Sequence, residues 1–512
     1  MKRIKKLASL FLAMIMVLAM AVPAMAKEAD LTGHEYKAFQ VFSGTQNDED
    51  GDAALASIEW GSGVNGDALL AALKADPTIG SVFTDVTTAE GVAKAIETAG
   101  WGEDSAQARA FARVAYANKT GDGVTVVNGQ TELDAGYYLV VDVTTFDPDD
   151  EDTVLNLALL QLTKKGTFEI KNKTDVPEVE KKVQETNDTT GETSGWQDAA
   201  DYDIGDDVPF QLTATLPTDY DSYVKYTLTF HDTLSAGLTY NDDADVFVVN
   251  GDQEIEITDQ VTATKANSTL TVAIADLKAL TGVTVTKDSK IVVRYTAKLN
   301  ASAVAGSAGN SNTVTLEYSN DPNNDGTGTP PTGTTPEDKV VVFTYNIVAD
   351  KVDKDGNALE GAGFTLYKWV KNDDDTEDWV KVGNEITGVT SFEFKGADAG
   401  KYKLVETTVP AGYNKADDII FEVVATYDTT SDDPSVTGLV VKNEAGEVIS
   451  GENLEFSATV NTGVVNTKVV NQKGSLLPET GGIGTTIFYV VGGILVVAAG
   501  ILLVTKKRMS VR

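Results

Sequence analysis

One lysine of this 512-residue chain occupies a position where a hydrophobic residue would be expected. In the segment 177–183, the alternation of a β-strand places Val179, Lys181 and Val183 on one face. A buried, unpaired ammonium group is very unfavourable, so Lys181 needs a partner or must lose its charge. Burial favours the neutral amine, which is a nucleophile. The pattern predicts amine chemistry in a dry core, or else an ordinary lysine whose ammonium reaches solvent.

A carboxamide lies in line with core residues later in the same region. The residues on this second strand face are Asn312, Val314, Leu316 and Tyr318. If strand pairing brings the Asn312 carboxamide to the Lys181 amine, the two groups can condense to an amide and release ammonia. The reaction needs a protonated carboxyl group to polarise the carboxamide, and Asp232 is the candidate. Asn310 and Asn320 are alternative acceptors, and a capping asparagine is the alternative without chemistry.

The composition excludes other kinds of chemistry. Cysteine is absent and there are two histidines, so a thiol nucleophile is excluded and a histidine-based hydrolase has few candidates. The net charge of −36 argues against nucleic acid as a partner and fits a self-repelling surface protein. No phosphate-binding GxxxxGK[ST] motif is present, and the Asp-rich turns lack the full calcium-loop pattern. We therefore expect no cofactor and no metal.

The two ends of the chain carry export and anchoring patterns. Residues 1–26 have a basic start, an apolar stretch at 7–22 and the small-x-small pattern of Ala24 and Ala26, which is typical of a signal peptide. At the other end, residues 475–512 contain a pentapeptide followed by an apolar run at 483–504, long enough to cross a bilayer core of about 30 Å. The basic cluster Lys506, Lys507 and Arg508 should stay on the cytoplasmic side. The pentapeptide is Leu477, Pro478, Glu479, Thr480 and Gly481.

Three segments between these ends have different periodicities. Residues 27–174 predict a mixed α/β domain, with strands at 36–42 and 136–141 and helices at 68–75, 89–99 and 106–117. Residues 175–338 and 339–474 contain regularly spaced short strands with turn signals, which favours two β-sandwiches. The predicted strands there are 208–216, 224–230, 246–249, 270–274, 290–299 and 313–318, then 340–348, 363–369, 391–394, 401–406, 419–426 and 464–470. The fold class is mainly β, with tandem immunoglobulin-like sandwiches.

The C-terminal pattern resembles the cell-wall sorting signal of Gram-positive surface proteins, the LPxTG substrate of sortase transpeptidases. The resemblance implies cleavage between Thr480 and Gly481 and transfer of the Thr480 carbonyl to an amine. It also implies a protein that is secreted and covalently anchored to peptidoglycan at the cell surface.

The second domain resembles the isopeptide-forming collagen-adhesin A type. The segments that carry this resemblance are VEKKV at 179–183, FHDTLSAGL at 230–238 and NTVTLEYSN at 312–320. The resemblance implies an isopeptide bond between Lys181 and Asn312, with Asp232 as the acid.

The third domain is similar to the collagen-adhesin B type, through 351–356, 359–364 and the E-box-like segment 402–413. The reactive lysine then corresponds to Lys351, the acid to Glu406 and the acceptor to Asn471, with Asn466 as the weaker alternative. Alternation supports this acceptor, because Val469 and Asn471 share a strand face.

The whole chain resembles a sortase-assembled backbone pilin, and its first domain resembles the N-terminal pilin domain through 34–39 and 136–140. That family uses a lysine in a VYPKN-like motif to accept the next subunit. Residues 167–173 keep Lys-Asn but lack Tyr-Pro, and the position relative to the following Pro177 favours Lys171 over Lys173. The implied partners are sortase, identical subunits, accessory pilins and peptidoglycan, in a fibre that supports adhesion. The alternative is an ancillary pilin or a monomeric wall-anchored adhesin; neither alternative is an enzyme.

Overall fold

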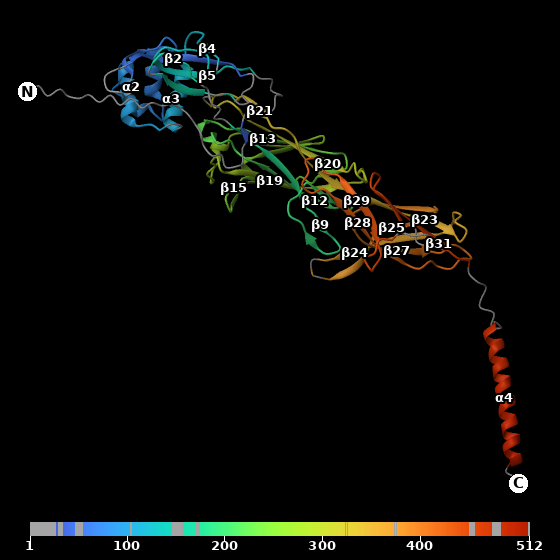
Figure 1. Cartoon of the computed structure of the whole chain (residues 1–512). Helices are drawn as coiled ribbons and strands as arrows, with labels where there is room; N and C mark the ends of the chain where they lie inside the picture. Colours follow the sequence, from blue (N-terminus) through green and yellow to red (C-terminus); the bar gives the residue numbers. More distant parts are fainter. Residues whose placement is uncertain are drawn as a thin grey trace, which may run out of the picture.

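The computed structural model of the chain shows three domains in a row, followed by a C-terminal helix (Figure 1). Figure 1 places the first domain and the C-terminal helix at opposite ends of this row. The structure describes residues 27–28, 34–46, 55–102, 105–127, 129–145, 155, 157–162, 164–168, 175–322, 324, 326–372, 374, 376–449, 456–473 and 483–509.

The first domain packs three α-helices on one face of a sheet, and so confirms the mixed α/β expectation. The helices are α1 (Gly66–Ala75), α2 (Ala89–Ala99) and α3 (Ala106–Ala117). Each begins after a side chain that accepts a backbone N–H of the first turn: Asn65, Thr88 and Ser105. The sheet order is β3 (Leu55–Trp60), β2 (Tyr36–Gln46), β5 (Gly136–Asp142) and β6 (Leu157–Leu162), with β4 (Val124–Val126) beside β2. Phe39 and Val41 lie in the core under the helices, because alternation points them to that face.

The second domain is a sandwich of two sheets. One sheet runs β11 (Ala199–Asp201), β22 (Asp338–Phe343), β20 (Asn310–Ser319), β13 (Leu228–Leu234), β18 (Thr269–Ile274) and β17 (Thr262–Ala266), with β21 (Thr332–Thr334) beside β20. The other runs β16 (Gln253–Glu256), β15 (Asp245–Asn250), β19 (Lys290–Leu299), β12 (Asp207–Ala214) and β8 (Val179–Val183), with β14 (Leu238–Tyr240) beside β19. Every second residue of β12 and β20 is buried, which is the pattern of a strand with one face on a core.

The third domain is a smaller sandwich. Its first sheet runs β26 (Ser391–Ala397), β23 (Tyr345–Asp353), β31 (Val464–Asn471) and β30 (Phe456–Thr459). Its second runs β25 (Glu377–Thr387), β24 (Gly363–Lys371), β27 (Gly400–Thr408), β28 (Ile419–Tyr427) and β29 (Val436–Lys442). The first and last strands of the domain, β23 and β31, are therefore parallel neighbours.

The strand β22 belongs to the second sandwich, because it pairs with β20 and β11. The boundary predicted between residues 338 and 339 falls within this strand, and sheet pairing moves it to Thr344. The single strand predicted at 340–348 is two strands, β22 and β23. Thr344 separates them without a glycine or proline, so no turn signal is present at this point of the sequence. The strand predicted at 224–230 starts at Leu228, and β25 and β29 were not predicted.

The second and third domains are joined by a network of buried charges. Lys368, on β24, directs its ammonium to carboxylates of both domains: Asp188 at 2.5 Å, Asp203 at 2.7 Å and Asp398 at 2.7 Å. The hydroxyl of Tyr427, on β28, bonds to Glu185 and lies 3.2 Å from Asp201 of the second domain. Asp188, Asp203 and Asp206 also lie close enough together to hold a metal ion, but Lys368 already neutralises two of them.

We expect the junction between these domains to weaken as the pH rises. Burial and the charge of Glu185 raise the pKa of Asp201 to about 7, and burial and Asp203 raise the pKa of Asp206 to about 6. Unfolded aspartate has a pKa of about 4, so the folded chain keeps protons that the unfolded chain has released. Stability is therefore lost as pH rises from about 4 to about 7. Calorimetry should show an unfolding temperature several degrees lower at pH 8 than at pH 5.

Self-repulsion of an acidic chain also grows with pH, so a variant is needed to isolate this effect. Asp201→Asn should flatten the pH dependence, whereas Asp259→Asn on the exposed surface should leave it unchanged. An equal slope in the wild type and Asp201→Asn would contradict the assignment to Asp201.

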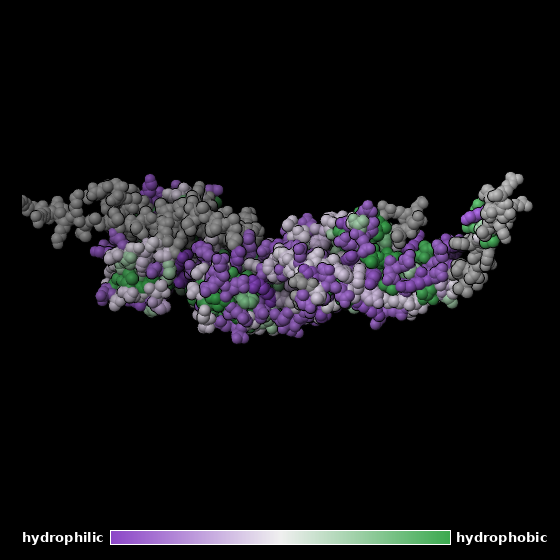
Figure 2. Space-filling view, turned by 90° about the horizontal axis from the view of Figure 1, so that it is seen from below, coloured by the Kyte–Doolittle hydropathy of each residue, from purple (hydrophilic) through white to green (hydrophobic). Residues whose placement is uncertain are grey.

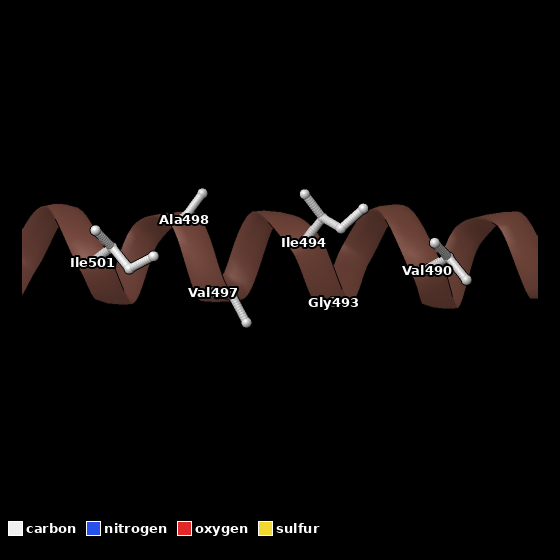
Figure 3. Close-up of a pocket in the computed structure, with 6 residues that line it drawn as sticks. All are labelled: Val490, Gly493, Ile494, Val497, Ala498 and Ile501. Atoms are coloured by element: carbon white, nitrogen blue, oxygen red, sulfur yellow. The ribbon is translucent and has the colours of Figure 1, made fainter.

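The C-terminal helix α4 covers Ile483–Met509. The structure describes its side chains at residues 490–502 and 506. Within the part of the chain that is described, no helix is both long and apolar enough to cross a membrane. Figure 3 shows one stretch of α4 with only apolar side chains and a glycine: Val490, Gly493, Ile494, Val497, Ala498 and Ile501. The domains differ from this helix, because the described surface in view is largely hydrophilic (Figure 2).

Candidate functional site

A lysine, an aspartate and an asparagine meet between the two sheets of the second domain. Lys181 lies on β8 at the edge of one sheet, while Asp232 on β13 and Asn312 on β20 belong to the other. All three residues are 0% exposed. Lys181 and Asn312 are therefore buried, as strand alternation predicted, and the structure places Asp232 beside them.

A tyrosine that was not among the predicted site residues connects these three groups. The Lys181 ammonium contacts Asp232 Oδ2 and lies 3.0 Å from the hydroxyl of Tyr295, on β19. The Tyr295 hydroxyl donates to Asp232 Oδ1 at 2.8 Å and accepts from Asn312 Nδ2 at 2.7 Å. Alternation along 290–299 puts Tyr295 on the core face, but a core tyrosine is common, and the sequence offered no further signal.

The surroundings of Lys181 favour a neutral amine. Burial lowers the pKa of Lys181 and raises that of Asp232, and the attraction between the two groups only partly opposes these shifts. The rings of Phe210 and Tyr295 lie 5.2 and 5.4 Å from the Lys181 nitrogen. In so apolar a site, transfer of the proton from lysine to aspartate gives an uncharged pair, which is what a nucleophilic amine requires.

The alternative acceptors lie outside this cluster. The side chain of Asn310 is fully used elsewhere, because it bonds to the backbone of Val304 at 2.9 and 3.1 Å and to Val342 O at 3.1 Å. Asn320 follows the end of β20 at Ser319. Unlike Asn310, Asn312 has a buried Oδ1 atom with no hydrogen-bond partner among the described residues.

A second cluster lies between the sheets of the third domain. Lys351 on β23, Glu406 on β27 and Asn471 on β31 are each 1% exposed. Asn471 Nδ2 donates to both oxygens of Glu406, at 2.7 and 3.0 Å. The Lys351 nitrogen donates to the carbonyl of Val469 at 2.8 Å, on the strand that carries Asn471. The structure thus brings together the three residues that the resemblance implied.

Burial lowers the pKa of Lys351 to about 8, against the opposing charge of Glu406. A useful fraction of this amine is therefore neutral near physiological pH. Asn466, the weaker alternative acceptor, is half-buried and bonds to Asp350 at 3.0 Å. It sits on the other side of β31 from the cluster, since its parity differs from that of Asn471.

Lys368 shows that burial alone does not make a nucleophile. It is 2% exposed, yet its three carboxylate neighbours raise its pKa far above the usual value. Lys368 therefore stays charged, and it serves as an ion-pair centre at the domain junction. Lys354, near Lys351 in sequence, is exposed and pairs with Asp355.

Several predicted residues lie outside the described part of the chain. They are the signal peptide 1–26, the lysines Lys171 and Lys173, and the sorting residues Leu477, Pro478, Glu479, Thr480 and Gly481.

Three family models match segments of this chain. Residues 204–322 match the Gram-positive pilin backbone subunit 2, Cna-B-like domain. Residues 345–434 match the SpaA prealbumin-like fold domain, and residues 469–510 match the LPXTG cell wall anchor motif. A curated relative, the trypsin-resistant surface T6 protein of Streptococcus pyogenes serotype M6, is 25% identical over 392 residues, 66% of this chain and 70% of the relative. Taken together, these matches support a sortase-assembled major pilin.

Solved backbone pilins resemble this pilin in outline. The T6 backbone pilin of Streptococcus pyogenes serotype M6 is 18% identical and gives a TM-score of 0.46, over 88% of this chain and 98% of that one. The full-length major pilin SpaD from Corynebacterium diphtheriae is 17% identical, with a TM-score of 0.42 over 71% and 87% of the two chains.

The family gives this pilin a structural role. It is a secreted subunit of a surface pilus, anchored to the cell wall through its LPXTG motif, and it is a substrate of sortase rather than an enzyme. The model that matches the second domain is described as Cna-B-like, whereas the sequence motifs of this domain resembled the collagen-adhesin A type.

Proposed function

We propose that this pilin closes each of its last two domains with an amide bond, Lys181 to Asn312 and Lys351 to Asn471. The observation that supports this most strongly is the same combination of residues in two separate cores, a buried lysine, a carboxyl group and an asparagine. A structural ion pair would not need the asparagine, and the Lys368 cluster lacks one.

The reaction is the same in both domains. The neutral lysine nitrogen attacks the carboxamide carbon, the new carbon–nitrogen bond forms, and the old one breaks to release ammonia. Asp232 in the second domain and Glu406 in the third are the acids that promote departure of ammonia. Fixed proximity in a dry core can lower such a barrier by about 7–11 kcal/mol in well-aligned cases.

The bonds have a mechanical purpose in a fibre. Lys351 and Asn471 lie on β23 and β31, the first and last strands of the third domain. Tension that enters at one strand and leaves at the other then passes through the amide bond instead of the β-ladder between them. The chain has no cysteine, so these bonds take the role that disulfides have in other exported proteins, and they cannot be reduced.

Alanine substitutions of two neighbouring asparagines, Asn312 and Asn310, test the second-domain bond. Asn312→Ala should leave the mature chain heavier than the wild-type product by about the mass of one ammonia, after correction for the substitution. Asn310→Ala should retain the bond, because Asn310 is engaged with backbone groups. Mass spectrometry of the intact chain measures the ammonia deficit, and peptide mapping identifies the linked lysine.

The wild-type chain should lack two ammonia molecules in this experiment. An Asn312→Ala chain that still lacks two ammonia molecules, or an Asn310→Ala chain that lacks only one, would contradict the assignment of Asn312 as the acceptor. A wild type with no deficit would contradict both bonds.

We further propose that sortase cleaves after Thr480 and joins its carbonyl to Lys171 of the next subunit, with Lys173 as the alternative. The sorting signal follows β31 of the third domain, while Lys171 precedes β7 (Asp175–Val176) at the start of the second. In chain order β7 begins the second domain and β31 ends the third, so the two segments border different domains, which suits head-to-tail addition. The specific sortase, any accessory pilins and peptidoglycan are the partners in this scheme.

A further inference from the structure

The carboxamide of Asn312 does not bond to the acid that should assist its reaction. Its Nδ2 atom donates to the Tyr295 hydroxyl at 2.7 Å, and that hydroxyl in turn donates to Asp232 at 2.8 Å. The same oxygen lies 3.0 Å from the Lys181 nitrogen. One phenol oxygen is thus shared by the nucleophile, the acid and the departing group.

We propose that Tyr295 is a catalytic residue of the second domain, which carries a proton from Lys181 to the departing nitrogen of Asn312. This inference rests on the proposed Lys181–Asn312 bond and assigns a further residue to it.

The proton balance is complete without any other reactant. Lys181 first gives its extra proton to Asp232, through the contact between them, and becomes a neutral amine. As Lys181 Nζ bonds to the Asn312 carbon, one Nζ proton passes to the Tyr295 oxygen. The Tyr295 hydroxyl proton passes to Asn312 Nδ2, the old carbon–nitrogen bond breaks, and ammonia leaves. Tyr295 ends the reaction as it began, a neutral phenol.

The packing around Tyr295 suits this role. Its ring stacks on Phe210 with centroids 5.4 Å apart and meets the edge of Tyr240 at 5.6 Å, so its hydroxyl has a fixed direction. Burial and the nearby Asp232 raise the pKa of Tyr295 well above its usual value. The phenol therefore remains protonated and has a proton to donate.

The third domain explains why only one of the two sites needs a phenol. There, Asn471 donates directly to Glu406, so the acid itself can exchange protons with the departing nitrogen. Among the described residues, the Lys351 nitrogen donates to the backbone carbonyls of Val469 and Val352. The third-domain bond is therefore an internal standard for any change at Tyr295.

The test follows both bonds over time in the same molecule. The full-length chain is synthesised in a cell-free system with detergent, samples are quenched in acid, and the two cross-linked peptides are quantified by mass spectrometry. In Tyr295→Phe the Lys181–Asn312 link should form at least about a hundredfold more slowly, the usual effect of losing a proton-transfer group, while the Lys351–Asn471 link forms normally. Tyr240→Phe removes a neighbouring phenol hydroxyl, which accepts from Ala244 N and has no other hydrogen bond among the described residues, and should leave both rates unchanged.

Two results separate this inference from the proposed function. A wild-type chain without the Lys181–Asn312 link would overturn the bond and Tyr295 together. A wild type that forms the link and a Tyr295→Phe chain that forms it equally fast would overturn Tyr295 alone.

A second variant distinguishes proton transfer from packing, and covers the case in which Tyr295→Phe misfolds. 3-Fluorotyrosine placed at position 295 keeps the shape and the hydroxyl but makes the phenol more acidic. The Lys181–Asn312 link should then form faster, because donation to the departing nitrogen is easier. An unchanged rate would overturn the proton-transfer role.

Discussion

Glu406→Gln is expected to abolish the Lys351–Asn471 bond and to lower the unfolding temperature of the third domain by about 10–20 °C. Glutamine has nearly the same shape but cannot supply a proton or accept one as a carboxylate does. Lys351 and Val469, beside Asn471 on its strand, are 118 residues apart in the chain. By analogy with disulfides, closing a loop of about 100 residues restrains the unfolded chain by about 4–5 kcal/mol.

The measurement combines intact mass with calorimetry on the mature chain. Glu406→Gln should retain only the ammonia loss of the second domain, and its third-domain transition should move to lower temperature. Glu385→Gln is the matched control, since Glu385 is exposed and bonds to Thr407 and Thr408 rather than to the buried cluster. A Glu406→Gln chain that keeps both ammonia losses would remove Glu406 from the reaction.

Lys171→Ala is expected to convert a ladder of SDS-resistant polymers into a single band near the monomer mass. The polymer is covalent in our proposal, so boiling in SDS does not separate its subunits, and without the acceptor amine no subunit can be added. An immunoblot of a cell-wall extract from the native bacterium measures this directly. The monomer should still be wall-anchored, because the sorting signal at 477–481 is intact in this variant.

Lys173→Ala is the matched control, two residues further along the same segment. It should leave the ladder unchanged. A ladder that survives Lys171→Ala and disappears in Lys173→Ala would move the acceptor to Lys173. A single monomer band in the wild type would contradict polymerisation and favour a wall-anchored adhesin.

Much of the site could be predicted from strand alternation. Lys181 and Asn312 share parity with core residues, and alternation along 464–471 likewise puts Asn471 on the buried face. Burial in the structure agrees with these assignments because a strand with one face on a core fixes the direction of every side chain along it. The helices of the first domain were equally predictable, since their apolar spacing and capping residues are local features.

Alternation does not say which residue lies opposite on the other sheet. Tyr295 was missed because its link to Lys181 and Asn312 crosses the sandwich, between strands that are far apart in sequence. Lys368 was missed as a buried charge because its partners Asp188 and Asp203 come from the preceding domain. The domain boundary at Thr344 was missed because only pairing with β20 assigns β22 to the second sheet.

The sequence by itself determined the sorting signal, the class of fold and the strand faces that carry the side chains of the proposed bonds, because each of these depends on local order along the chain. Only the tertiary structure decided whether the pKa of each buried lysine falls or rises. Lys181 meets one carboxylate in an apolar site and its pKa falls, whereas Lys368 meets three and its pKa rises. That difference depends on how the sheets and domains pack, since the balance between desolvation and nearby charge is set by groups that the chain brings together only on folding.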